Sequence, residues 1–140
     1  MSAYVFDSHA LLAFFQGEPG SDIVEGILRQ PQQPRQPYSG AVNDRLICLI
    51  NLGEIVYLTK RRFGNEKKIE ALSRIYQLGF KILSVDDSLV FQAAELKAQY
   101  ALSYADCFAL ACSINHAAVL VTGDHEFKTV AHLVAIEWIR

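Results

Sequence analysis

Four of the 15 acidic residues in this sequence lie among apolar neighbours, and their types could do chemistry together. Asp7 follows the apolar run YVF, Asp124 follows LVTG, and Glu54 and Asp106 stand inside LGEIV and ADCFA. An acid in such surroundings tends to be partly buried, which is costly unless the carboxylate is paired, hydrogen-bonded or bound to a metal. The other acids, Glu126 among them, have polar neighbours or stand where helices begin, so we assign them to the solvated surface.

Convergence of the four acids would create a site for a divalent cation. Like charges that share a site repel one another, and protons or a metal must relieve the repulsion. Carboxylate oxygens favour Mg²⁺ or Mn²⁺ over zinc. Such ions bind phosphate oxygens, activate water and stabilise the leaving oxygen when a phosphodiester is cleaved. A chain of net charge −2 could therefore still act on nucleic acid.

Each of these acids also has a simpler interpretation as a helix cap. Asp7 would cap the helix that follows it, and Asp124 would cap a helix or stabilise a turn. The patterns NLGE and SYAD both fit a capping box that uses Glu54 and Asp106. The two interpretations are compatible, because a helix N-terminus keeps a carboxylate in the ionised form that a metal needs.

Short apolar runs that alternate with helical patterns predict a mostly parallel α/β sheet covered on both faces. Strands are expected at residues 4–6, 46–50, 81–85, 117–122 and 134–139. Helices are expected at residues 8–15, from 21 onward, and at 51–63, 66–78, 87–100 and 103–115, with a short one near 126–131. In such a sheet the carboxyl ends of the strands and the starts of the following helices face one crevice, so acids placed there can converge.

The segment 30–40, QPQQPRQPYSG, holds three of the four prolines and predicts a loop. We interpret it as a surface linker between elements. A mobile flap over a site is the alternative.

Length and composition predict one globular domain, residues 1–140, of which 51% are hydrophobic and 20% are charged. Net charge −2 excludes a protein that recognises nucleic acid by bulk positive charge. The N-terminus does not resemble a signal peptide and no apolar run has the roughly 20 residues of a membrane span, so no membrane contact is expected. Cys48, Cys107 and Cys112 form no CxxC pair, which favours buried thiols and a cytoplasmic location.

Four short motifs follow one another along the chain. They are VFDS with a following LLA, NLGEI, LSYAD with a following ALA, and LVTGD with Phe127. In this order they resemble the motifs of PIN-domain nucleases, and specifically the small VapC-like toxins of type II toxin–antitoxin systems. The resemblance covers the full length of the chain, although the proline-rich segment is not typical of the family.

This resemblance implies a three-layer α/β/α sandwich around a mostly parallel sheet. It also implies a Mg²⁺- or Mn²⁺-dependent endoribonuclease that hydrolyses phosphodiester bonds of RNA through metal-activated water. Asp7, Glu54, Asp106 and Asp124 would be the catalytic acids that bind the metal, with Asp124 acting directly or through water.

The same resemblance implies supporting residues and partners. Ser8, Ser103 and Thr122 match hydroxyl positions near the family's site and would orient ligands or waters. The chain would form a homodimer and would be inhibited by a cognate antitoxin protein.

Basic, imidazole and aromatic side chains add weaker signals. The trio Lys60, Arg61 and Arg62 is read either as a solvated helix end or as a contact to the RNA backbone. The four histidines form no metal-ligand pattern and are assigned to surface or packing, although His9 and His125 lie near proposed ligands. Four aromatic residues are assigned to the core or to a dimer interface: Tyr57, Phe63, Tyr76 and Phe91.

Other classes of protein stay open. A haloacid-dehalogenase-type phosphatase also has an Asp at the end of its first strand, but it needs a second Asp two positions on, where this chain has His9. A receiver-type domain needs an acidic pair beside that strand, where this chain has Asp7 alone. A PIN-like RNA-binding or scaffold domain would keep the fold without catalysis.

Overall fold

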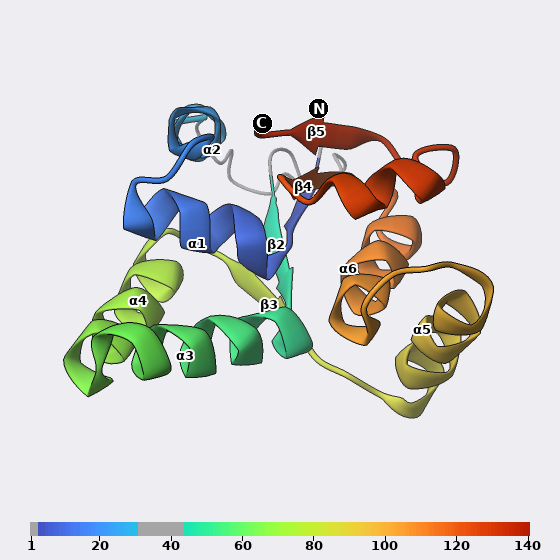
Figure 1. Ribbon diagram of the computed structural model, residues 1–140, viewed down its shortest axis with the longest axis horizontal. Helices are drawn as coiled ribbons and strands as arrows, with labels where there is room; N and C mark the ends of the chain where they lie inside the picture. Colours follow the sequence, from blue (N-terminus) through green and yellow to red (C-terminus); the bar gives the residue numbers. More distant parts are fainter. Residues whose placement is uncertain (1–2, 31–43) are drawn as a thin grey trace, which may run out of the picture.

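A five-stranded parallel sheet forms the centre of the protein in the computed structural model, which describes residues 3–30 and 44–140 (Figure 1). The strands are β1 (Tyr4–Phe6), β2 (Arg45–Cys48), β3 (Lys81–Leu83), β4 (Val119–Thr122) and β5 (Ile136–Trp138). Their order across the sheet is β3-β2-β1-β4-β5, and every neighbouring pair is parallel.

Helices cover both faces of this sheet. They are α1 (Ser8–Gln16), α2 (Ser21–Leu28), α3 (Leu49–Phe63), α4 (Asn65–Gln77), α5 (Asp87–Gln99) and α6 (Tyr104–Asn115), with the 3₁₀ helix η1 (His125–Val130). Figure 1 shows α1, α3 and α4 on one side of the sheet and α5 and α6 on the other. The predicted three-layer α/β/α fold is confirmed.

The central strands are buried on both faces because successive side chains point to opposite sides of a sheet. Phe6 belongs to the core cluster under α1, α2, α3 and α4, while its neighbour Val5 belongs to the cluster under α5 and α6. Ile47 and Leu46 divide between the two clusters in the same way. The apolar runs that form β1, β2 and β4 therefore become strands buried on both faces, whereas the edge strands β3 and β5 are partly exposed.

The boundary between β2 and α3 differs from the prediction. Strand β2 ends at Cys48 and α3 begins at Leu49, so the assignment of residues 49 and 50 to a strand is wrong. Leu49 is 47% exposed, which places it on the outer surface of the first helical turn. A short apolar run does not distinguish a buried strand from the start of a helix. One consequence is that Asn51 lies inside α3 and does not cap it.

Arg45 ties two helix ends to the start of β2. Its buried guanidinium donates to the carbonyl oxygens of Leu78 and Leu28, each at 2.6 Å, and to that of Gln30 at 2.9 Å. Leu28 ends α2 and Leu78 caps α4, so the cation binds carbonyls that the two helices leave without partners. These contacts lie at the amino edge of the sheet.

Two further expectations concern segments and thiols. The three cysteines are free and buried, as predicted. Residues 31–40 of the proline-rich segment 30–40 lie outside the described residues. In the described ranges, no helix has the length and apolar character needed to cross a membrane.

Candidate metal site at the sheet's carboxyl edge

The acids gather where the direction of the chain connections reverses. Strands β1 and β4 are neighbours. The chain leaves β1 through α1, which packs on one face, and leaves β4 through η1, which packs on the other. In open parallel sheets a crevice forms at such a switch point, outside the carboxyl ends of the strands. Asp7 directly follows β1 and Asp124 comes two residues after β4.

Asp7 is the most buried of these acids, with 1% of its surface exposed. One carboxylate oxygen accepts the backbone N–H of Ala10 at 2.8 Å and thereby caps α1. The other accepts the hydroxyl of Thr122 from the end of β4. Burial outweighs these hydrogen bonds and raises the pKa of Asp7 to about 7. Asp7 is therefore both a helix cap and a carboxyl group poised between its two protonation states.

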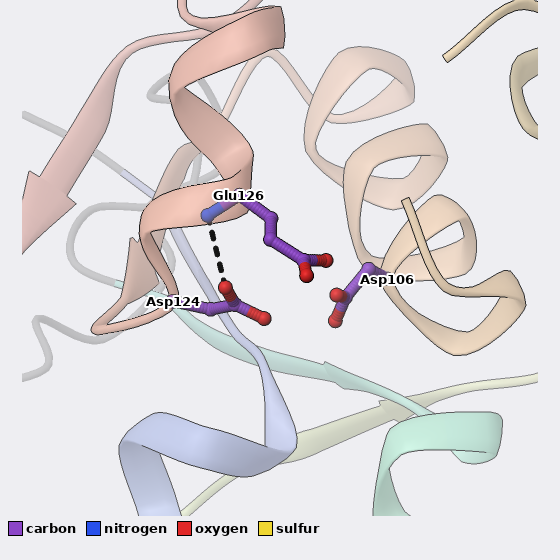
Figure 2. Close-up of side chains that lie close together, drawn as sticks. All are labelled: Asp106, Asp124 and Glu126. Atoms are coloured by element: carbon purple, nitrogen blue, oxygen red, sulfur yellow. Dashed lines mark hydrogen bonds between the residues drawn. The ribbon is translucent and has the colours of Figure 1, made fainter. Parts of the chain in front are cut away.

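Three other carboxylates come together beside Asp7. Asp106 projects from the first turn of α6 toward Asp124 and Glu126, which lie at the start of η1 (Figure 2). One oxygen from each lies within 4.8 Å of the other two. Asp124 also caps η1 by accepting the N–H of Glu126 at 2.9 Å. Burial and then repulsion from Asp124 raise the pKa of Asp106 to about 7.

Glu54 reaches the same edge from α3. Its Oε1 accepts the hydroxyl of Ser8 at 2.9 Å and the amide of Asn51 at 3.4 Å. The amide nitrogen of Asn51 also donates to the carbonyl oxygen of Ala105, at 3.2 Å, so it joins α3 to the start of α6. The carboxylate of Glu54 raises the pKa of Asp106, which shows that the two acids are close enough to interact.

All four predicted acids thus lie in one electrostatic neighbourhood. Asp106 and Asp124 both raise the pKa of Asp7, and Glu54 acts on Asp106. Glu126 was assigned to the surface and is indeed exposed, but it stands within the group of three. The spacing Asp-x-Glu two residues after a strand is the signal that would have found it.

The donor set fits a hard divalent cation. Every candidate ligand is a carboxylate oxygen, the type that Mg²⁺ and Mn²⁺ prefer. Neutral carboxyl groups cannot serve as such ligands, and the raised pKa values of Asp7 and Asp106 show that the site favours protons when no cation balances its charge.

The three predicted hydroxyl residues each contact an acid or cap its helix. Ser8 donates to Glu54, Thr122 donates to Asp7, and the hydroxyl of Thr122 also accepts the N–H of Asp124 at 2.9 Å. Ser103 caps α6 by accepting the N–H of Asp106 at 3.2 Å.

The basic trio lies at the other end of α3 from Glu54. The first residue of the trio, Lys60, comes six residues after Glu54, which is about 9 Å along the helix axis. The guanidinium of Arg61 stacks over the ring of Tyr57, with 5.4 Å between its central carbon and the ring centroid. Arg62 donates to the side chain of Gln16 at 3.1 Å.

Fold and site together define an α/β protein with a cluster of carboxylates at its switch point. The family model described as PIN domain matches residues 4–133, so the chain belongs to the PIN-domain family. No curated protein sequence matches the chain closely enough to count as a relative.

Solved structures with the same fold come from toxin–antitoxin systems. A chain from a toxin–antitoxin complex of Klebsiella pneumoniae shares 20% identity, covers 98% of both chains and has a TM-score of 0.68. VapC20 of Mycobacterium tuberculosis, described as a sarcin–ricin loop cleaving toxin, shares 16% identity over 91% of this chain and 94% of its own, with a TM-score of 0.71. A chain from DNA-bound VapBC of Salmonella typhimurium shares 14% identity, covers 100% of both chains and also has a TM-score of 0.71.

Proposed function

We propose that this protein is a Mg²⁺- or Mn²⁺-dependent endoribonuclease and the toxin of a toxin–antitoxin pair. The observation that carries the proposal is the group of carboxylate oxygens from Asp106, Asp124 and Glu126, which lie within 4.8 Å of one another beside Asp7. Membership of the PIN-domain family and the fold shared with a toxin that cleaves the sarcin–ricin loop support it.

Different residues would bind the cation and orient its ligands at this site. Asp7, Glu54, Asp106 and Asp124 would hold the cation, and Glu126, beside Asp106 and Asp124, would add a further carboxylate. When bound, the divalent ion supplies activation of a water and stabilisation of the leaving oxygen. The Thr122 hydroxyl and the Ala10 N–H hold the Asp7 carboxylate in one orientation. Ser8 does the same for Glu54.

An antitoxin protein and a second copy of the chain are the proposed partners. The solved structures with this fold include toxin–antitoxin complexes. Four large aromatic side chains are predicted from the sequence to lie in the core or at a dimer interface. They are exposed, so the core alternative is wrong for them. They are Tyr57, Phe63, Tyr76 and Phe91, with 47% to 69% of their surfaces accessible. Light scattering of the purified protein tests the dimer, and a monomer at micromolar concentration would contradict it.

The decisive experiment compares two Asp→Asn variants that both alter the first turn of a helix. Asp106→Asn removes a proposed ligand at the start of α6, whereas Asp22→Asn removes an exposed acid at the start of α2. Each protein is incubated with RNA and Mg²⁺ or Mn²⁺, with and without chelator. Mn²⁺ binding is measured by calorimetry. We expect Asp22→Asn to keep cleavage and Mn²⁺ binding, and Asp106→Asn to lose both.

Two results would overturn the proposal in different ways. Cleavage that survives chelator and Asp106→Asn would refute the metal mechanism. A wild-type protein that binds no Mn²⁺ and cuts no RNA would favour the scaffold alternative.

A further inference from the structure

A pocket of about 630 Å³ that contains Arg140 adjoins the carboxylate cluster. It is lined by His9 from α1, by Gly123, Asp124 and His125 after β4, and by Arg140 after β5. Asp124 belongs both to this pocket and to the proposed metal site. A group bound in the pocket would therefore lie beside the place where RNA is proposed to be cut.

Arg140 is held in this pocket from two sides. The backbone N–H of Ile139 donates to the carbonyl oxygen of Thr122 at 3.0 Å, which keeps the chain alongside β4. A main-chain oxygen of Arg140 accepts from Nε2 of His125 at 2.9 Å, and the Arg140 guanidinium donates to Nε2 of His9 at the same distance. The position of the cation is thus set by both ends of the residue.

These contacts also determine the hydrogen-bonding roles of the two imidazoles. A guanidinium only donates, so Nε2 of His9 must accept and its Nδ1 must carry the proton. That Nδ1 is buried and has no hydrogen-bond partner. His9 therefore presents a donor without an acceptor next to a cation.

Gly123 makes room for this arrangement. A Cβ at that position would lie 2.7 Å from Cε1 and 2.9 Å from Nδ1 of the His9 ring. A residue with a side chain at this position would force the His9 ring to move. The pocket is thus built from contacts that a larger residue would break.

In the described part of the chain, most N–H donors of the Arg140 guanidinium make no hydrogen bond. A guanidinium offers five N–H donors, and within the described ranges Arg140 uses its side chain only on His9 and forms no ion pair. It is exposed. A permanently charged, planar donor that is positioned but not paired suits a phosphate, which it can bind with two parallel hydrogen bonds.

We propose that Arg140 binds a backbone phosphate of the RNA substrate, next to the phosphodiester that the carboxylate site cleaves. This inference rests on the proposed ribonuclease function. It adds a specific anion-binding residue to that function. His9 and His125 act as positioning residues, which hold the guanidinium toward the substrate.

The test uses full-length Arg140→Ala and Arg140→Lys, with Arg29→Ala as the matched control. Arg29 is also exposed, but it caps α2 at the amino edge of the sheet, where Arg45 binds the last carbonyl of that helix. Cleavage of a short single-stranded RNA is measured with Mn²⁺ over a range of KCl concentrations, and Mn²⁺ binding is measured by calorimetry.

We expect Arg140→Ala to raise KM about tenfold, as the loss of a charged hydrogen bond does, while kcat and Mn²⁺ affinity change little. The slope of log KM against log KCl concentration should fall by about 0.7, the value for one phosphate contact on a single strand. Arg140→Lys should restore the slope and part of the KM, because it keeps the charge but not the planar fork. Arg29→Ala should behave as wild type.

The outcomes separate this inference from the function on which it rests. If wild type cuts RNA and Arg140→Ala has the KM and salt slope of Arg29→Ala, Arg140 does not bind phosphate, although the nuclease proposal stands. If Arg140→Ala loses Mn²⁺ binding or kcat and Arg140→Lys does not recover the salt slope, the role of Arg140 is structural. If wild type cuts no RNA, the proposed function itself fails.

Discussion

Replacement of Asp7 by Asn should stabilise the protein in the absence of metal while abolishing its proposed function. Asp7 is 1% exposed, and burial raises its pKa from 3.8 to about 7. Between pH 3.8 and about 7, Asp7 is therefore protonated in the native state but ionised in the unfolded chain. The contribution of Asp7 to the free energy of unfolding is fully present below pH 3.8 and is lost as the pH rises through about 7.

The size of this loss follows from the shift in pKa. Each pKa unit corresponds to about 1.4 kcal/mol, so the change from 3.8 to about 7 amounts to about 4 kcal/mol. Asparagine has the shape of the neutral acid and does not ionise. Its amide oxygen can keep the bond from Ala10, whereas the Thr122 hydroxyl loses its acceptor, at a cost of about 1 kcal/mol at every pH. The expected net gain above pH 7 is about 3 kcal/mol.

Thermal unfolding in the presence of chelator measures this effect. For a chain of this length, 3 kcal/mol corresponds to a rise in Tm of roughly 10 °C. We expect that rise for Asp7→Asn at pH 8 and a slightly lower Tm than wild type at pH 4. Asp22→Asn removes an exposed acid from the first turn of α2. It should lower the free energy of unfolding by no more than about 1 kcal/mol, so its Tm should stay close to that of wild type. Added Mn²⁺ should then stabilise wild type but not Asp7→Asn, because a ligand stabilises only the state that binds it.

The reasoning would be refuted if Asp7→Asn lowered Tm at pH 8, or if it shifted Tm by the same amount at both pH values. The first result would mean that the carboxylate is stabilising without metal. The second would mean that the effect comes from hydrogen bonding and not from ionisation.

Three further predictions follow from particular contacts. Arg45→Ala should lower the free energy of unfolding by about 3 kcal/mol in urea titrations, because three carbonyl oxygens lose a charged donor; a change below 1 kcal/mol would contradict that role. Glu126→Gln should weaken Mn²⁺ binding roughly tenfold in calorimetry because it removes one carboxylate charge, and unchanged affinity would exclude it as a ligand. Contact with Cys112 lowers the pKa of Cys48 to about 7, yet both thiols are buried, so iodoacetamide should modify them only in denaturant; rapid reaction of the native protein would show that the core opens.

The local signals in the sequence were sufficient for the fold. Continuous apolar runs predicted strands that are buried on both faces, and the sheet is parallel as expected. Helix caps were also readable, since Asp7, Ser103 and Asp86 each accept an N–H in the first turn that follows them. The start of α3 was not readable, because Leu49 and Ile50 have the same composition in a strand as in a helical turn.

For the candidate site, the amino-acid pattern identifies which acids lie at strand ends and helix starts. It could not determine how they are arranged, because that depends on which strands become neighbours. The pairing of β1 with β4 brings Thr122 to Asp7 across 115 positions of the chain. The path of η1 turns Glu126 toward Asp106, and the end of β5 places Arg140 on His9. Periodicity reports the local conformation of each segment, whereas charge repulsion, burial and raised pKa values arise only between segments that tertiary packing has brought together.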